Sequence, residues 1–583
     1  MSGDNPAETL PNGEATTASP SPLPPRSSPA PLPPAVASLP QKRALEDHHS
    51  PAISSPLKSE HGAKKSQAAE DGGVMAREKR TKKESLKKRE SKAATTPGGV
   101  EPSRATPDPR QSKKNSKNVP PAEMGPARYI LPLPKAGDFE PARGPQLASH
   151  HTVTGPSGEQ IEFFETQEHV YNKKQYYYTH CIADPKFPSS FYYRQTEPEP
   201  FGPHMSFEDA ATHLFFDRSG KHITTDKGWR MSRANVAIRE GTWYWECKIT
   251  RGILKDPPAL DSEQPDSRGH VRVGFARREA AIDAPAGFDA YSYGIRDKEG
   301  QKVYMSRPKD FFPPGEDIRE GDVIGLEIGL PSEQLHRKVV SGHYNPAVDL
   351  LEEADHGTAE VPNIVRDRLP IRFKAHIYFE TPDYHTTPEL DDLMNPSPMS
   401  ASGSGAGSSE GPNPNHPIPC MRTLPKSWIK VYKNGVDMGT AFNNLLAFLP
   451  LASKPATAKQ PDAREGLDDG MLGYYPAVSV FRGGAAEVNF GPKFWYPPPG
   501  YEQEDTGGDV AMTGTEEPST VTVQQEVPRP MVERYDEQIV EDVVYDIVDE
   551  VDFWMQDGAK VIDRTRRDAD EEVKEFKEVV QDV

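Results

Sequence analysis

The residues best suited to chemistry are few and scattered in this 583-residue chain. Its three cysteines are too few for a four-cysteine zinc site or a disulfide framework. The histidine pairs His48-His49 and His150-His151 have no cysteine or third histidine at metal-ligand spacing. There is also no nucleophile elbow, HExxH motif or Walker loop. We therefore expect a protein that is not an enzyme, with no metal, no cofactor and no small-molecule substrate.

Charge is distributed unevenly along the chain. The formal net charge is -19, yet residues 77–118 are strongly basic and the chain after 533 is dense in Asp and Glu. Clustered cations attract the phosphates of DNA through counterion release, and such runs also serve as nuclear-import addresses. Both uses stay open: the first predicts direct contact with DNA and the second a nuclear location. The run contains Arg77, Lys79, Arg80, Lys82, Lys83, Lys87, Lys88 and Arg89.

The apolar residues that would form a core follow strand patterns. In GTWYWECKI the alternate residues from Trp243 to Ile249 share one face of an extended chain, and HVRVGFA repeats this period with Arg272 on the polar face. We expect further strands at 322–330 and 371–380. Hairpins are predicted at Asn434-Gly435 and at Gly483-Gly484. Many short strands with little helix predict an all-β fold, an antiparallel β-sandwich.

Composition divides the chain into segments, with 61 prolines and a mean hydropathy of -0.74. Residues 1–125 are predicted to be disordered. Residues 126–200 are rich in aromatics and should pack on the core, although the tyrosines at 176–178 would stack on bases in the alternative interpretation. The sandwich spans 201–500, with flexible inserts at 394–417 and 452–470. A linker at 501–530, a helix at 531–557 and an acidic tail at 558–583 follow. No apolar run approaches the ~20 residues that span a bilayer, so no membrane partner is expected.

The expected C-terminal helix is amphipathic. Its apolar residues recur at a period of 3.6, and acidic residues fill the other face. A narrow apolar stripe on an acidic helix, beyond a linker, predicts docking into the groove of a partner. Packing against its own sandwich is the alternative. The stripe comprises Val540, Val543, Val544, Ile547 and Val551.

These motifs together resemble a known family. The resemblance rests on TTDKGWRMSRANVAIREGTWYWE, VRVGFARREAAIDAPAGFDAYSYGIRDKEG, GDVIGLEIGLP, VYKNGVDMG and VNFGPKFWYPP. These segments are similar to the SPRY (B30.2-like) domain of the trithorax-group subunit of COMPASS/Set-type histone H3 lysine-4 methyltransferase complexes. EDVVYDIVDEVDFW resembles the C-terminal docking motif of the same family. Three cysteines exclude the upstream zinc finger of many relatives, which places the chain with the short fungal-type members.

The resemblance implies a non-catalytic scaffold and activator. Its SPRY domain would bind an acidic segment of the β-propeller subunit, and its helix would enter the groove of a dumpy-type docking dimer, to stimulate the SET-domain catalytic subunit. Guanidinium groups beside an aromatic ring and a proline suit an acidic peptide. A ubiquitin-ligase substrate adaptor is the alternative, although no cullin-box, RING or B-box element is present. Carried over by motif, the propeller site comprises Trp229, Arg272, Pro285, Phe288 and Arg296.

Overall fold

The computed structural model describes residues 134–155, 158–166, 176–184, 193–256, 267–352, 364–366, 368–373, 376–382, 384, 386–395, 410–449, 468–502 and 527–556. The N-terminal tail with its basic run, most of both inserts, most of the linker and the tail beyond 557 lie outside the described residues.

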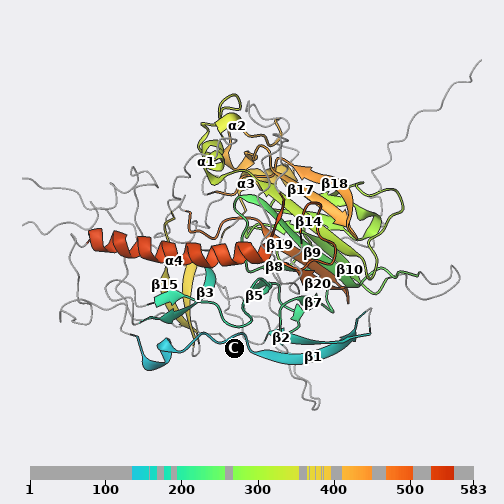
Figure 1. Cartoon of the computed structure of the whole chain (residues 1–583), viewed down its shortest axis with the longest axis horizontal. Coiled ribbons are helices and arrows are strands. Elements are labelled where there is room, and N and C mark those ends of the chain that lie inside the picture. The colour runs from blue at the N-terminus through green and yellow to red at the C-terminus, as the bar shows by residue number, and fades with distance from the viewer. Residues whose placement is uncertain are drawn as a thin grey trace, which may run out of the picture. The chain divides into compact units, whose positions relative to one another are not determined.

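Two sheets of antiparallel strands face each other across a shared core (Figure 1). The ten-stranded sheet runs in the order β1 (Leu147–Thr154), β2 (Gln160–Thr166), β6 (Phe215–Phe216), β7 (His222–Thr224), β20 (Ala485–Asn489), β9 (Gly241–Arg251), β14 (Val323–Leu330), β17 (Trp428–Lys433) and β18 (Val436–Asn443), and β21 (Arg529–Pro530) pairs with β9 in parallel. The seven-stranded sheet runs in the order β13 (Arg307–Lys309), β12 (Lys302–Tyr304), β11 (Ser292–Arg296), β10 (His270–Ala276), β19 (Tyr475–Phe481), β8 (Arg230–Ala234) and β5 (Met205–Ala210). The fold is the expected all-β sandwich.

A third sheet has four strands and is separate from the two sheets of the sandwich. Its order is β15 (Leu369–Phe373), β16 (His376–Pro382), β3 (Tyr176–Ala183) and β4 (Tyr193–Gln195). It has a small core of its own, in which Cys181 and Tyr193 pack with Phe379. The aromatic-rich extension is therefore divided, because β1 and β2 extend the sandwich while β3 and β4 build this sheet. The expected strand at 371–380 is wrong: that segment is the β15–β16 hairpin.

The helices are short apart from the last one. They are η4 (Ala136–Phe139), η5 (Lys298–Gly300), α1 (Glu333–Ser341), α2 (Asp349–Glu352), α3 (Pro388–Met394), η7 (Pro419–Met421) and α4 (Met531–Gln556). Helix α1 was not predicted, although the Ser332 side chain caps its first turn and Gly342, at φ 79°, ends it. Among the described residues, no helix is long and apolar enough to cross a membrane.

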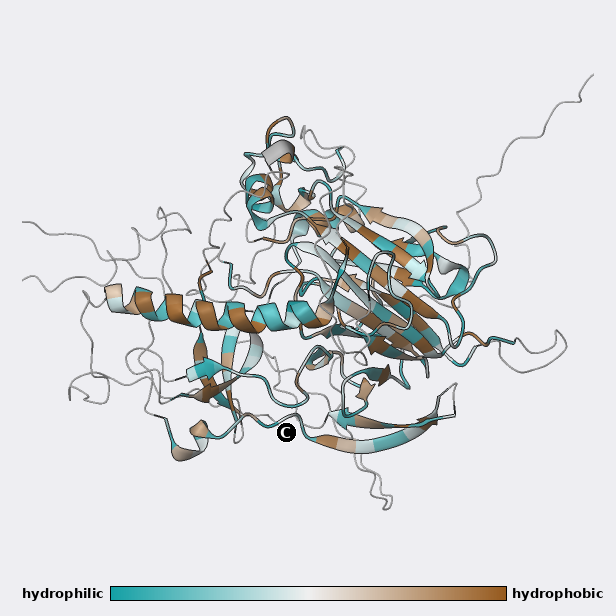
Figure 2. Cartoon of the chain, viewed as in Figure 1, coloured by the Kyte–Doolittle hydropathy of each residue, from teal (hydrophilic) through white to brown (hydrophobic). Residues whose placement is uncertain are grey.

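The core is organised around β9. Trp243, Trp245, Cys247 and Ile249 are buried on one face, as their spacing predicts. The ring of Trp245 packs against Phe275 of the opposite sheet, with ring centroids 6.2 Å apart, and this contact joins the two layers. Figure 2 shows hydrophobic residues concentrated in the strands of the sandwich.

The polar face of β9 is not exposed to solvent. Tyr244 and Glu246 are buried there, beneath the segment that follows β20. The Glu246 carboxylate accepts hydrogen bonds from the backbone N–H groups of Trp495 and Tyr496, both at 2.7 Å. These bonds compensate the carboxylate for lost water and tie the segment down over the sheet.

The two predicted hairpins have different outcomes. Asn434 and Gly435, at φ 50° and 80°, turn the chain between β17 and β18 as expected. The hairpin at Gly483-Gly484 is wrong, because β19 and β20 belong to different sheets. Gly483 has φ 91°, and a Cβ on Gly484 would stand 2.2 Å from the His270 carbonyl oxygen. Glycines are needed here for a close crossing between layers rather than for a hairpin.

The ends of both expected inserts are structured. His416 is fully buried, and its Nδ1 accepts from the Ile418 N–H at 3.0 Å. Asp468 is buried and accepts from Arg239 at 2.7 Å. Buried polar groups with such partners are typical of a folded core. These residues therefore belong to the core, and the inserts are shorter than expected.

The packing of Trp245 makes the core testable. We expect Trp245→Ala to lower the free energy of unfolding by about 3–5 kcal/mol, because it leaves a large cavity between the sheets. Trp495→Ala is the matched control: that side chain is 36% exposed, and its loss should cost less than about 1 kcal/mol. Urea unfolding of both variants measures the difference. Equal losses would contradict this account of the core.

Candidate docking surfaces

Two arginines lie side by side on the seven-stranded sheet. Arg272 of β10 and Arg296 of β11 are directly opposite each other in the strand register. The Arg272 guanidinium lies over the ring of Trp229, 5.1 Å from its centroid. Within the described ranges, neither arginine has a carboxylate at ion-pair distance. Like charges opposite each other in a sheet are unfavourable, so this pair is not explained by sheet stability.

The loop that carries Pro285 and Phe288 crosses the same face. The Ala286 N–H donates to the Ser479 hydroxyl at 2.9 Å, and its carbonyl accepts from Arg272 Nη1 at 3.2 Å. Gly294 permits this approach, because a Cβ there would stand 2.3 Å from the Ala286 carbonyl oxygen. The structure thus brings together the five predicted residues, which we call the arginine site: Trp229, Arg272, Pro285, Phe288 and Arg296.

The arginine site carries an incompletely compensated charge. Arg272 is half-buried, and its Nε has no hydrogen-bond partner. Burial lowers the pKa of this guanidinium to about 10, with attraction by Asp297 opposing the effect and repulsion by Arg296 adding to it. The group remains a cation at neutral pH. Trp229 is buried and supports the guanidinium from beneath, so an anionic ligand would meet the two arginines first.

The second surface is the apolar stripe of α4. All five predicted residues are exposed, from Val543 at 39% to Val540 at 62%. Figure 2 shows hydrophobic residues recurring on successive turns of this helix. Among the described residues, nine of the sixteen exposed large hydrophobic side chains lie on α4. We call these nine the α4 stripe: Ile539, Val540, Val543, Val544, Ile547, Val548, Val551, Trp554 and Met555.

The opposite face of α4 is anchored on its own chain. Near its start, Met531 is fully buried and Tyr535 nearly so, both within the main core cluster. The Gln538 side chain accepts from the Ala237 N–H at 2.9 Å and donates to the Asn235 carbonyl at 3.2 Å. The alternative of self-packing is therefore correct for one face of the helix, while the α4 stripe stays exposed.

The acidic residues farther along α4 are also turned inward. Asp546 and Asp549 are 4% and 1% exposed, although their residue type predicts a solvent-facing surface. Arg366 Nη2 lies 2.8 Å from an oxygen of each, and Arg368 Nη1 lies 2.7 Å from Asp546 Oδ1. Sequence reasoning missed these arginines. The only signal was their alternation in VRDRL, which does not reveal a partner some 180 positions away along the chain.

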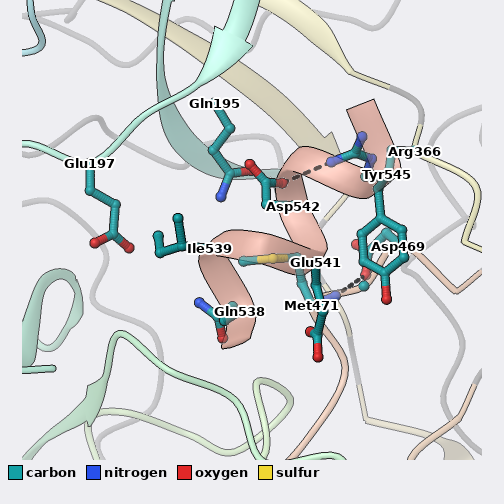
Figure 3. Close-up of a pocket in the computed structure, with 11 residues that line it drawn as sticks. Gln195, Glu197, Arg366, Asp469, Met471, Gln538, Ile539, Glu541, Asp542 and Tyr545 are labelled. Atoms are coloured by element: carbon teal, nitrogen blue, oxygen red, sulfur yellow. Dashed lines mark hydrogen bonds and ion pairs between the residues drawn. The ribbon is translucent and has the colours of Figure 1, made fainter. Parts of the chain in front are cut away.

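A small pocket separates α4 from the segment after β4 (Figure 3). Arg366 pairs with Asp542 at its edge, with 2.8 Å between Nη1 and Oδ1. Glu197 lines the pocket and accepts a hydrogen bond from the Tyr535 hydroxyl. Burial raises the pKa of Glu197 to about 7, although this hydrogen bond opposes the shift. Burial likewise raises the pKa of Asp549 to about 6.

These raised pKa values predict a pH dependence. Between the ordinary glutamate pKa of about 4.3 and about 7, folded Glu197 holds a proton that the unfolded chain has lost. Its contribution to stability is therefore greatest below this window and falls as the pH rises through it. We expect Glu197→Gln, which mimics the protonated form, to raise stability by about 1 kcal/mol at about pH 8 and to change little at about pH 5.

Thermal unfolding across this pH range measures the effect. Glu199→Gln, an exposed position two residues away, is the matched control and should keep the wild-type pH profile. Parallel profiles for wild type and Glu197→Gln would contradict the assignment. Glu208, Asp542 and His180 face Glu197 and are left unchanged in this comparison.

Comparison with known proteins shows which family the chain belongs to. No family model matches the chain. The COMPASS component cclA of Colletotrichum higginsianum is 60% identical, over 90% of this chain and 91% of the relative. The Set1 complex component ash2 of Schizosaccharomyces pombe is 35% identical, over 89% of this chain and 60% of the relative. Among solved structures, a human SPRY domain is 13% identical and covers 48% of this chain and 98% of its own, with a TM-score of 0.23.

The all-β fold follows from the sheets described above. The sequence match to cclA is high in identity and covers nearly the full length of both proteins. The chain belongs to the family of COMPASS components that includes cclA and ash2.

Proposed function

We propose that this protein is a nuclear, non-catalytic scaffold and activator subunit of a histone H3 lysine-4 methyltransferase complex. Its relatives are named as components of COMPASS and Set1 complexes. The α4 stripe and the arginine site are two surfaces for two different protein partners. Together they hold the β-propeller subunit and a small dimeric docking subunit beside the SET-domain catalytic subunit. The basic run at 77–118, outside the described residues, supplies the import address or a contact with nucleosomal DNA.

The observation that carries this proposal is the exposure of the α4 stripe. The surface of a folded protein rarely exposes nine large apolar side chains on one helix unless a partner covers them. Val540, Val544, Ile547, Val551 and Trp554 are spaced alternately by four and three residues, the spacing with which a helix seats in a groove between other helices. A dimer of the dumpy-type docking subunit offers such a groove.

The arginine site supports the second interaction. Arg272 and Arg296 present two cations without carboxylate partners among the described residues, and the half-exposed Phe288 lies in the loop whose Ala286 carbonyl accepts from Arg272. An acidic segment of the β-propeller subunit would complete these ion pairs. Guanidinium groups bind carboxylates in two-point hydrogen bonds, which adds specificity to the charge attraction.

The α4 stripe can be tested with a buried charge. We expect Val544→Glu and Ile547→Glu each to weaken binding of the docking subunit by about 100-fold or more, because a carboxylate would lose its water in an apolar groove. Co-purification and isothermal titration measure the loss. Val436→Glu on β18 is the matched control: that valine is 63% exposed, and its replacement should leave binding unchanged. Normal binding by both α4 variants would exclude the stripe as the docking surface.

The arginine site has its own test. We expect Arg272→Ala to weaken binding of an acidic propeller-subunit peptide by about 30-fold or more, since removing one partner of a desolvated charge pair costs about 2–5 kcal/mol. Fluorescence anisotropy with a labelled peptide measures the affinity, and a melting curve checks the fold. Arg143→Ala, at an exposed arginine that pairs with Glu140, should bind as wild type. An unchanged affinity for Arg272→Ala would refute the site.

A further inference from the structure

The amino-acid sequence of α4 does not by itself favour a helix. Its residues include a high share of Val and Ile, whose branched side chains lower helix propensity. Asp542, Asp546 and Asp549 stand at i, i+4 and i+7, a spacing at which like charges on a helix repel. The last turn carries no basic residue to balance the negative end of the helix dipole. As an isolated segment, residues 541–556, which we call the acidic half of α4, would form a helix poorly.

The four-stranded sheet supplies the missing cations. Arg194 lies in β4, and Arg366 and Arg368 lie in the lead-in to β15; we call these three the arginine clasp. Arg368 Nη2 lies 2.7 Å from Asp542 Oδ1, and Arg194 Nε lies 3.5 Å from Asp546 Oδ2. With the Arg366 bonds, all three aspartates of the i, i+4, i+7 row are engaged, and Asp546 meets every member of the clasp.

The clasp is built into its own sheet. The Arg194 guanidinium is held by Asp184 at 2.8 Å, and Arg368 Nη2 also donates to Gln195 Oε1 at 3.0 Å. Arg368 lies over the ring of Phe379, 5.1 Å from its centroid, and Arg366 lies over Tyr545 of α4 at 5.5 Å. Arg366 and Arg368 are 4% and 8% exposed, so their charges are already desolvated and need these carboxylates.

We propose that the four-stranded sheet is a receptor for α4, and that Arg194, Arg366 and Arg368 are positioning residues that keep the acidic half helical. By binding the acidic face, the clasp turns the α4 stripe outward before any partner arrives. A partner then meets a formed helix and does not bear the cost of ordering it. The effect on partner affinity rests on the proposed docking function, whereas the effect on the helix itself does not.

Hydrogen–deuterium exchange of the full chain without partners tests the clasp. In Asp542→Asn/Asp546→Asn, which keeps side-chain shape but removes charge, we expect amides in 541–556 to exchange at least tenfold faster. Asp536→Asn, at an exposed acid of the same helix, is the matched control and should leave the rates unchanged. Amides of β9 and β14 report the sandwich and should be unaffected. Unchanged rates in the double variant, or unprotected amides in the wild type, would overturn the proposal.

A second variant approaches the clasp from the sheet. Arg366→Lys/Arg368→Lys keeps both positive charges but loses the two-point geometry, so exchange should lie between wild type and the Asn double variant. Exchange equal to or slower than wild type would contradict the positioning role.

Titration with the docking subunit separates the clasp from the proposed function. We expect the Asn double variant to bind about tenfold more weakly than wild type, whereas Val544→Glu binds about 100-fold more weakly or worse. If exchange responds to the clasp while Val544→Glu binds normally, the clasp stands and the docking proposal fails. If Val544→Glu loses binding while the exchange rates of the Asn double variant equal those of wild type, the docking proposal stands and the clasp proposal fails.

Discussion

The constraint on which this structure depends is that charge removed from water must meet opposite charge. The buried arginines follow this rule: Arg233 faces Asp209, Arg239 faces Glu333 and Asp468, and Arg277 faces Glu279. Breaking such a buried pair costs about 3–5 kcal/mol, so these contacts restrict which segments can lie together. The attachment of α4 to the four-stranded sheet follows the same rule.

At the two proposed docking surfaces, charged or apolar side chains lack the partners that such groups usually have within a folded chain. At the arginine site, two cations lie opposite each other with no carboxylate partner among the described residues, held in place by the Trp229 ring and the Ala286 carbonyl. On α4, Asp546 and Asp549 are buried against arginines while the nine residues of the α4 stripe are exposed, which reverses the usual orientation of an amphipathic helix on a folded core. An anionic segment would complete the first surface, and an apolar groove would cover the second.

Local pattern was sufficient to predict much of this fold. The alternation in GTWYWECKI places the residues from Trp243 to Ile249 in the core, and Asn434-Gly435 forms the expected turn. The same kind of signal failed at Gly483-Gly484, since glycines with positive φ serve both a hairpin and a crossing between sheets. Periodicity likewise predicts which residues share a face of α4 but not which face meets the protein. That choice depends on Arg366 and Arg368, about 180 positions away, where no local pattern indicates a partner.

The orientation of α4 is the central claim, and thiol reactivity tests it directly. The native cysteines Cys181, Cys247 and Cys420 are buried, so an introduced thiol dominates labelling by a maleimide. In the isolated protein, Ile547→Cys should react at about the rate of a free thiol, and Phe553→Cys, at a position 5% exposed, should react at least tenfold more slowly. Binding of the docking subunit should then protect the thiol of Ile547→Cys. Slow labelling of Ile547→Cys together with fast labelling of Phe553→Cys would contradict the account.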